Sequence, residues 1–345
     1  MHSTAHTMFS RRTVFVIGAG ASAECGLPEG SRLKGDIENG LRFGFRSDPT
    51  GDNELWEILR LRENGNKDRL GLLRKCANDL ARTVRTFPSI DEALHWWRRI
   101  PETVDVGKLA IAHYILKAER ESFLAPNKQT GRVDIGSAND TWLAQFLSMV
   151  LSGLPQEKSS NAFNDVVVIN FNYDRSLEHY LFHALQNVGL DKTAAIECIA
   201  RLKIIRPYGS LGHLPWQTSK GGIDFGSSNS SVQIAPHIRT FTEQISGPNI
   251  ASIIDAEFSE AELVIFLGFG FHQQNMELLE PIAASSRKKV RAVFATMYRI
   301  DERNYSAIEA RLNDRLALSP KPTLVDLTSF QLLSKLRMSI SMLAG

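Results

Sequence analysis

The chain of 345 residues is poor in cysteine and has no long apolar run. Its three cysteines, Cys25, Cys76 and Cys198, lie far apart and form no C-x-x-C pair. This spacing argues against a disulfide framework and against a structural zinc site. The longest apolar stretches, such as ELVIFLGFGF, are too short to cross a bilayer, and MHSTAHTMFSRR at the start lacks a signal-peptide core. We therefore expect a cytoplasmic protein with no membrane association and no metal.

The sequence also lacks an excess of either charge. Forty Lys and Arg residues face thirty-eight Asp and Glu residues, which gives no direct signal for nucleic acid. No G-x-x-x-x-G-K-[ST] motif is present, so the chain is not expected to be an ATPase itself. His95-Trp96-Trp97 beside two arginines is one candidate nucleic-acid surface, but the helical pattern favours core packing for Trp96 or Trp97. His179 and His183, four residues apart, lack further metal ligands.

Short β-branched apolar runs are what the chain does contain. They occupy residues 13–18, 165–170, 202–207, 262–268, 290–296 and 323–327. Their hydrophobicity is continuous rather than alternating, which is typical of parallel strands covered on both faces. Helical patterns follow most of the runs after residue 165, as in βαβ units. The sequence predicts an α/β fold: a Rossmann-like doubly wound parallel sheet of about six strands.

About 145 residues separate the first two runs and contain no convincing strand. Leu70, Leu73, Ala77, Leu80 and Val84 recur at spacings of three and four, the stripe of an amphipathic helix. Residues 89–100, 106–124 and 140–154 also read as helices, with Ser89 and Glu92, and Asp140 before Thr141, as N-terminal caps.

The domain organisation follows from these patterns. We expect a sheet domain formed by residues 1–45 and 160–345, with an all-helical insertion of residues 46–159 after the first βα unit. The Gly- and Ser-rich stretch 218–231 is expected to be a mobile loop.

The first strand runs into VFVIGAGASAECGLPEG, residues 14–30. Gly18-Ala19-Gly20 and the small residues after it fit the G-x-G-x-x-G/A pattern, which lets a backbone approach a pyrophosphate. A dehydrogenase would place a second strand soon afterwards, ending in an acidic residue. Here Gly26-Leu27-Pro28 follows instead, so the first helix is expected to be short, with a loop able to cover a nucleotide. The alternative is that the glycines only make a tight turn.

Four motifs in order, GAGASAECGLPEG, VVVINFNYDRSLEHYL, IIRPYGSLG and LVIFLGFGFHQQN, resemble the sirtuin-like superfamily. The resemblance is closest to bacterial sirtuin-like proteins of antiviral defence. It implies that NAD lies in an extended cleft at the carboxyl ends of the strands, with no metal. The nucleotide-binding residues it implies are Gly18, Ala19, Gly20, Ala21 and Ser22 at the phosphates, Leu27 and Pro28 over the nicotinamide ribose, Asn172 and Asp174 of the Asn-x-Asp motif, Gly209, Ser210, and Gly268, Phe269, Gly270 and His272 near the ribose or adenine.

The chemistry of NAD cleavage suits these residue types. Breaking the nicotinamide–ribose bond builds oxocarbenium character, so a neutral amide such as Asn172 can position a ribose hydroxyl or a water. Ionised Asp174 can stabilise the developing positive charge. The alternative for both residues is that they cap the following helix. His272 or Asn275 can hydrogen-bond a hydroxyl.

One departure from the family concerns Tyr208, which stands where the family has a catalytic histidine before Gly-Ser. A phenol with an ordinary pKa near 10 is a poor general base at neutral pH. Three outcomes remain: Tyr208 orients the substrate through its hydroxyl, His213 replaces the imidazole, or activity is low or lost.

These observations lead to an expected function: an NAD hydrolase that releases nicotinamide and ADP-ribose, acting as the effector of a bacterial antiviral system that depletes NAD on infection. The alternative is a module that binds NAD or ADP-ribose without cleaving it. A protein deacylase is disfavoured because the four zinc cysteines are missing. Partners expected from the resemblance are further copies of the chain and a hexameric DNA-translocating ATPase bound through the helical insertion.

Overall fold

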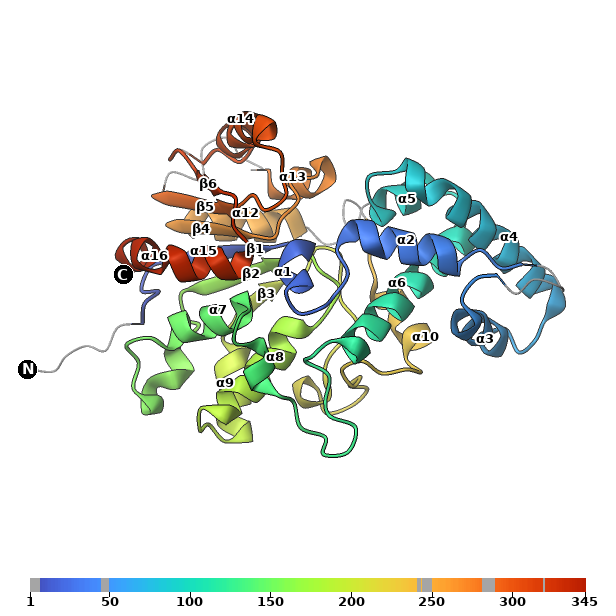
Figure 1. Cartoon of the computed structure of the whole chain (residues 1–345), viewed down its shortest axis with the longest axis horizontal. Helices are drawn as coiled ribbons and strands as arrows, with labels where there is room; N and C mark the ends of the chain where they lie inside the picture. Colours follow the sequence, from blue (N-terminus) through green and yellow to red (C-terminus); the bar gives the residue numbers. More distant parts are fainter. Residues whose placement is uncertain (1–6, 45–49, 241–242, 244–249, 281–288, 319) are drawn as a thin grey trace, which may run out of the picture.

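A computed structural model describes residues 7–44, 50–240, 243, 250–280, 289–318 and 320–345, and within them six strands form one parallel sheet (Figure 1). The order is β3-β2-β1-β4-β5-β6, and each neighbouring pair is parallel. The strands are β1 (Thr13–Ile17), β2 (Val166–Asn170), β3 (Lys203–Ile205), β4 (Leu263–Leu267), β5 (Ala292–Thr296) and β6 (Thr323–Val325). Each strand lies in one of the six predicted runs, and the predicted fold class is confirmed.

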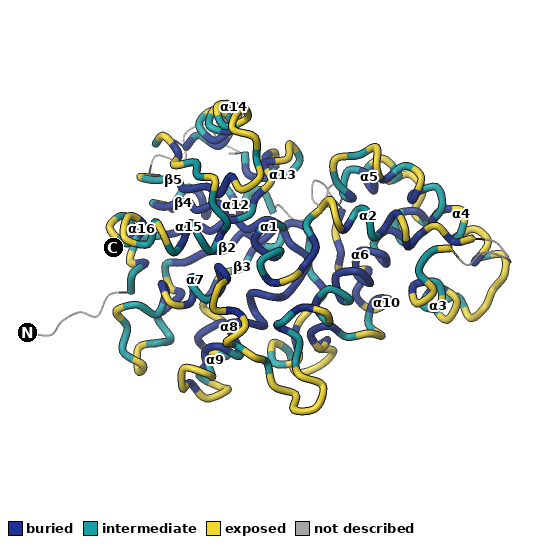
Figure 2. Tube along the Cα trace, viewed as in Figure 1, coloured by how far each residue is buried: buried dark blue, intermediate teal, exposed yellow. Residues whose placement is uncertain are grey.

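Both faces of the sheet are covered, as the continuous hydrophobicity predicts. In β1, Val14 and Val16 belong to one buried cluster, and Phe15 and Ile17 belong to the other. Successive side chains of a strand point to opposite faces, so each cluster is the core on one side of the sheet. The buried trace of the sheet and its flanking helices is continuous through the centre of the molecule (Figure 2).

Helices on the two faces complete the doubly wound architecture. One face is packed by α7 (Trp142–Leu151), α8 (Ser176–Asn187), α9 (Lys192–Ala200), α15 (Ser329–Lys335) and α16 (Arg337–Ala344). The other is packed by α12 (Ile250–Glu260), α13 (Gln273–Leu279) and α14 (Tyr305–Ala310). Shorter helical segments elsewhere in the described chain are α1 (Ala19–Ala23), α10 (Ser231–Ile234) and the turns at 84–86, 135–138, 156–161, 215–217, 235–237, 302–304 and 311–315.

A group of helices stands beside the sheet, and we call residues 30–121 the helical module (Figure 1). It contains α2 (Gly30–Gly40), α3 (Asn53–Arg62), α4 (Lys67–Thr83), α5 (Ile90–Trp96) and α6 (Pro101–Glu121). Helix α4 packs along α6, and α2 packs on both. All five positions of the predicted amphipathic stripe are buried, and the Ser89 side chain caps α5 by accepting from Glu92 N.

The module differs from the predicted insertion at both ends. Helix α7 falls within the range 46–159, but it packs on the sheet, where the Phe146 ring lies 5.1 Å from that of Phe15. Its first amide, on Trp142, donates to Glu24, and the side chain of Thr141 makes no cap hydrogen bond. Helix α2 lies within the range assigned to the sheet domain, yet it packs on α4 and α6. Helix α7 is therefore a crossover helix of the sheet, and α2 begins the module.

A buried ion pair joins the module to the sheet. Arg175, just beyond β2, donates to Glu119 of α6 at 2.6 Å, and both side chains are almost fully buried. Arg175 also donates to the carbonyl groups of Ile223 and Asp224, so it anchors the stretch 218–231 that the sequence suggested as a mobile loop. Phe225 of the same stretch is buried.

Two of the sequence candidates, Trp97 and His179, take structural positions. Trp97 is partly buried and donates to Thr83 Oγ1 at 3.0 Å, whereas the neighbouring Trp96 is 64% exposed. His179 is buried with a hydrogen bond to the carbonyl of Leu124, and burial lowers its pKa to about 3. The described residues contain no group of three His, Cys, Asp or Glu side chains able to hold a metal. In the same part of the chain, no helix has the length and apolar character required to span a membrane.

Candidate functional site

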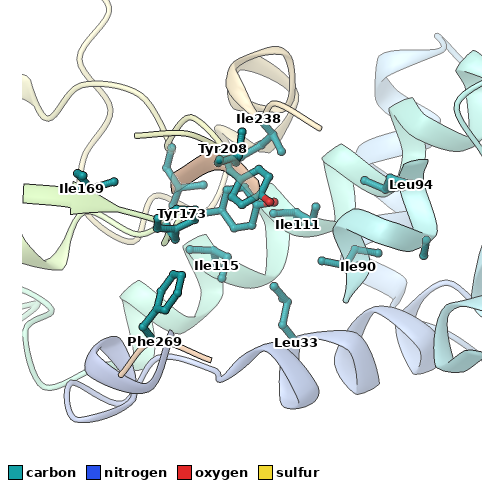
Figure 3. Packing of buried hydrophobic residues seen from close by; sticks show 14 of the residues in the cluster. Leu33, Ile90, Leu94, Ile111, Ile115, Ile169, Tyr173, Tyr208, Ile238 and Phe269 are labelled. Carbon is teal, nitrogen blue, oxygen red and sulfur yellow. The ribbon is translucent and has the colours of Figure 1, made fainter. Parts of the chain in front are cut away.

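A cavity of about 710 Å³ lies at the carboxyl ends of the strands. Its wall includes residues that follow each strand, from Tyr208 beyond β3 to Ser329 beyond β6. The strand order reverses between β1 and β4, where open parallel sheets bind ligands. The helical module closes one side with Leu33, Asp91 and Ile115. In Figure 3, Ile115 lies between Leu33 of the module and Tyr173 of the loop after β2.

The first glycine turn interlocks with the turn after β4. A side-chain carbon on Gly18 would lie 2.5 Å from the carbonyl oxygen of Gly268, and one on Gly268 would lie 2.0 Å from the amide nitrogen of Ala21. The Gly20 amide donates to Gly268 O at 3.0 Å, and Gly268 has a φ of 57°. Close packing of two backbones therefore explains these glycines without a ligand, and neither Gly18 nor Gly20 has the positive φ that a tight turn can demand.

The same turns also form cavity wall. Gly18, Ala19, Gly20 and Ser22 line the cavity, whereas Ala21 is buried behind them. Helix α1 spans only Ala19–Ala23, the short first helix that the sequence predicts. The wall continues with Leu27 and Pro28 in the loop after α1, and with the expected residues after β4: Gly268, Phe269, Gly270, His272 and Asn275.

A chain of hydrogen bonds connects the predicted Asn-x-Asp motif to the glycine turn. Asn172 Nδ2 donates to the carbonyl of Gly18 at 2.9 Å and to Ser22 Oγ at 2.7 Å. Ser22 Oγ in turn donates to Asp174 Oδ2 at 2.7 Å. A carbonyl can only accept, so the contact with Gly18 fixes the orientation of the Asn172 amide. All three side chains are buried and line the cavity.

Asp174 also stabilises the start of α8. Its Oδ1 accepts from the amide of Ser176, the first residue of that helix, at 3.0 Å. One carboxylate oxygen thus accepts from the helix amide, and the other accepts from the Ser22 hydroxyl. The two interpretations of Asp174 are therefore compatible: it caps a helix and contributes a carboxylate to the cavity wall.

Tyr208 is a buried hydrogen-bond donor. Its hydroxyl donates to Asn275 Oδ1 at 2.8 Å, and its ring packs against Phe171 and Tyr173. Burial, followed by the charge of Asp91, raises the pKa of the Tyr208 phenol well above its ordinary value. Tyr208 therefore stays protonated at neutral pH and can donate but cannot act as a base.

The residues after Tyr208 lie outside the cavity wall. Gly209 has a φ of 75°, and a side-chain carbon there would lie 2.1 Å from the carbonyl oxygen of His237. Ser210 hydrogen-bonds the amide of Gly212, and His213 is exposed. None of Gly209, Ser210 and His213 lines the cavity. Of the residues proposed for binding or catalysis, these three and Ala21 are the ones the structure leaves outside.

Asp91 lines the cavity, although none of the four sequence motifs contains it. It lies in the first turn of α5, and the Tyr173 hydroxyl donates to its Oδ1 at 2.5 Å. Burial raises the pKa of the Asp91 carboxyl to about 6. In the sequence, Asp91 has the appearance of an ordinary acidic residue beside a helix cap, so no local signal marks it.

Glu24 is a second carboxyl of the cavity wall that the sequence motifs do not identify. Its two oxygens accept from the amides of Trp142 and Phe330, at the starts of α7 and α15. Burial raises its pKa, and these amide hydrogen bonds oppose the rise. Glu24 therefore holds two helices against the cavity wall.

Most of the charged side chains that line the cavity are acidic. Glu24, Glu29, Asp91 and Asp174 line it, and among its described residues Arg299 alone carries a Lys or Arg charge. Arg299 follows β5 and lies over the ring of Tyr298, 5.0 Å from its centre. The wall thus offers carboxylates near β1, β2 and the module, and a cation at the β5 side.

Comparison with protein-family models and with curated proteins finds no match to this sequence.

Proposed function

We propose that this protein is an NAD hydrolase, cleaving NAD to nicotinamide and ADP-ribose. The observation that carries the proposal is the hydrogen-bond chain from Asn172 through Ser22 to Asp174, set in the wall of a cavity at the reversal point of a parallel sheet. The resemblance of the four sequence motifs to sirtuin-like proteins supports the same activity.

The cavity is suited to an extended dinucleotide. Its volume of about 710 Å³ is in the range of cofactor-sized sites. The wall runs from the loop after β3 to the loop after β6, and neighbouring strands are about 4.8 Å apart, so the span is on the order of 20 Å. The backbone of both glycine turns lines the cavity, so a pyrophosphate can lie against it, and Arg299 can offset part of its charge.

The residues of the wall have distinct roles in this reaction. The Asn172 amide spends both donors on Gly18 and Ser22, which leaves its acceptor oxygen for a ribose hydroxyl. Water adds to C1′ of the ribose, and the bond to nicotinamide breaks with its electron pair going to the ring nitrogen. Asp174 and the other wall carboxylates favour the positive charge that develops on the sugar. Tyr208 orients the substrate or Asn275 by donating its hydroxyl.

A second candidate function is binding of NAD or ADP-ribose without cleavage. The observation that favours it is the buried, protonated Tyr208 at the position of the family's histidine. Incubating the protein with NAD and following free nicotinamide separates the two. The hydrolase yields nicotinamide and ADP-ribose in equal amounts, whereas the binding module raises the melting temperature with NAD and yields neither. Acyl-peptide turnover would instead identify a deacylase.

The biological role that fits an NAD-depleting enzyme is antiviral defence in the bacterial cytoplasm, held inactive until infection. The motif resemblance suggests a homo-oligomer and a hexameric DNA-translocating ATPase as regulators, docking on the helical module. Mass measurement of the protein alone and mixed with such an ATPase tests this part. A monomer that the ATPase neither binds nor activates would contradict it.

A further inference from the structure

The helical module contributes an acidic side chain to the cavity. Asp91 lies in the first turn of α5, whose start is fixed by the hydrogen bond from Glu92 N to Ser89 Oγ at 3.1 Å. The neighbouring Ser89 and Ile90 also line the cavity. Asp91 is partly buried, and it lines the cavity together with Asn172, Tyr173 and Asp174 of the Asn-x-Asp loop.

The surroundings of Asp91 keep it able to exchange a proton near neutral pH. Burial raises the pKa of its carboxyl to about 6, and the hydrogen bond from Tyr173 opposes the rise. Titratable and charged groups from several elements surround Asp91 and its tyrosine neighbours. The acidic ones are Glu92 on α5, Glu277 on α13 and Glu243, which pairs with Lys108 of α6. The others are Tyr173 after β2, Tyr208 after β3, His272 at the start of α13 and Lys34 on α2.

Asn172, Tyr208, Glu24 and Asp174 are less suited to taking a proton than Asp91. Asn172 does not titrate, and Tyr208 is held protonated. Glu24 is engaged by two helix amides, and Asp174 by Ser22 and Ser176. His272, the imidazole of the wall, lies beyond β4, whereas Asp91 is hydrogen-bonded to the Asn-x-Asp loop. His213, the imidazole nearest in sequence to the family's histidine position, is exposed and outside the wall.

We infer that Asp91 is the general base of the NAD hydrolysis proposed above, and that the helical module thereby completes the catalytic site. The inference rests on that proposed function. As water adds to C1′ and nicotinamide leaves with the bonding electron pair, one proton of the water passes to the Asp91 carboxylate. Release of that proton to solvent restores the carboxylate, so each cycle consumes one NAD and one water and yields nicotinamide, ADP-ribose and a proton.

The role of the module follows from this assignment. The sheet contributes the glycine turns and Asn172, and the module contributes the base. Tyr173, the middle residue of the Asn-x-Asp motif, donates a 2.5 Å hydrogen bond to Asp91 and so ties the base to the motif loop. A partner that shifts α5 relative to β2 changes the rate without touching the nucleotide turns.

The test compares wild type with Asp91→Asn, Tyr173→Phe and the control Asp79→Asn. Asp79 makes the same carboxyl-to-amide change on α4 of the module, where it pairs with Arg82 outside the cavity wall. Nicotinamide release is measured from pH 5 to 8.5, and ADP-ribose binding by calorimetry confirms that each variant retains its site. Asp91→Asn is expected to lose about 100-fold or more in kcat while still binding ADP-ribose.

The pH profile separates a base from a structural group. Wild-type kcat/KM is expected to fall tenfold per pH unit below about 6, as the Asp91 carboxylate is protonated. Tyr173→Phe removes a hydrogen bond that favours the ionised form, so its acid limb moves to higher pH. Full activity of Asp91→Asn, or an acid limb that Tyr173→Phe leaves unmoved, overturns the inference while NAD turnover stands. Absence of turnover by wild type overturns the proposed function and this inference together.

Discussion

The Tyr173 hydroxyl donates a 2.5 Å hydrogen bond to Asp91 Oδ1, joining the end of β2 to a helix 82 residues earlier in the chain. Two residues after Tyr173, Arg175 is paired with Glu119 of α6. The Asn-x-Asp motif loop is thus held between two contacts with the helical module. The geometry of the cavity therefore depends on how the module packs, as well as on the sheet.

The Arg175–Glu119 pair is expected to be costly to break. Glu119→Ala leaves a buried guanidinium without its partner, which typically costs about 3–5 kcal/mol of unfolding free energy. Urea denaturation measures the loss. Glu121→Ala, an exposed position two residues on, is the matched control and is expected to change stability by less than about 0.5 kcal/mol. Equal effects of the two substitutions contradict the role given to the pair.

We expect opposite effects on stability from two Gly→Ala changes, one at Gly268 in the interlocked turns and one at Gly35 inside α2. Gly268→Ala forces a positive φ on alanine and places its side chain 2.0 Å from Ala21 N, so we expect a loss of at least about 2 kcal/mol. Gly35→Ala lies inside α2 with open space around it and is expected to gain up to about 1 kcal/mol. Thermal unfolding of both variants checks the pair, and a tolerated Gly268→Ala contradicts the close approach.

The raised pKa of Asp91 predicts how stability depends on pH. The folded protein binds the Asp91 proton more tightly than the unfolded chain does. The contribution of this proton to the free energy of unfolding is therefore complete below about pH 4 and is lost as pH rises through about 6. Asp91→Asn cannot ionise. We expect it to exceed wild type at pH 8 by on the order of 2 kcal/mol, with the difference closing toward pH 4. Unfolding at pH 8, 6 and 4.5 measures this, and a constant difference is the contrary result.

We expect the Tyr208 hydroxyl to orient the substrate or Asn275, and not to ionise. Tyr208→Phe keeps the ring contacts with Phe171 and Tyr173 but loses the hydrogen bond to Asn275, worth about 1 kcal/mol. KM should therefore rise roughly fivefold with little change in the shape of the pH profile. His213→Ala serves as the control, since its exposed side chain lies outside the cavity wall, and its kinetics should match wild type. Abolished activity in His213→Ala would show that the imidazole acts after all.

Much of the fold could be predicted from local pattern. Strands buried on both faces need continuous apolar runs, and all six runs form strands of the sheet. The stripe from Leu70 to Val84 marked α4 for the same kind of reason, because burial on one helix face imposes its spacing. The side of the sheet on which a helix packs has no such local signal. The absence of a strand before residue 165 places α7 in the predicted insertion, although its Phe146 packs on Phe15 of the sheet.

The candidate site is predictable mainly where its residues follow strands, with Leu27 and Pro28 of the loop after α1 as the exceptions. Gly18, Asn172, Tyr208 and Gly268 all follow strands, and parallel strands bring their carboxyl ends to one edge. Asp91 reaches the cavity from a separate helix through tertiary packing, which leaves no trace in the letters around it. For the same reason, sequence proximity to Tyr208 suggests that His213 can replace the imidazole, whereas the structure leaves His213 exposed and outside the cavity wall.

The most direct test of the central claim is nicotinamide release from NAD by wild type, Asn172→Ala and Asn187→Ala. Asn172 lines the cavity and is tied to Gly18 and Ser22, whereas Asn187 is exposed at the end of α8. We predict turnover by wild type and Asn187→Ala, and a loss of about 100-fold or more in Asn172→Ala. Undiminished turnover by Asn172→Ala, or none by wild type with or without a partner ATPase, would contradict the assignment of this protein as an NAD hydrolase.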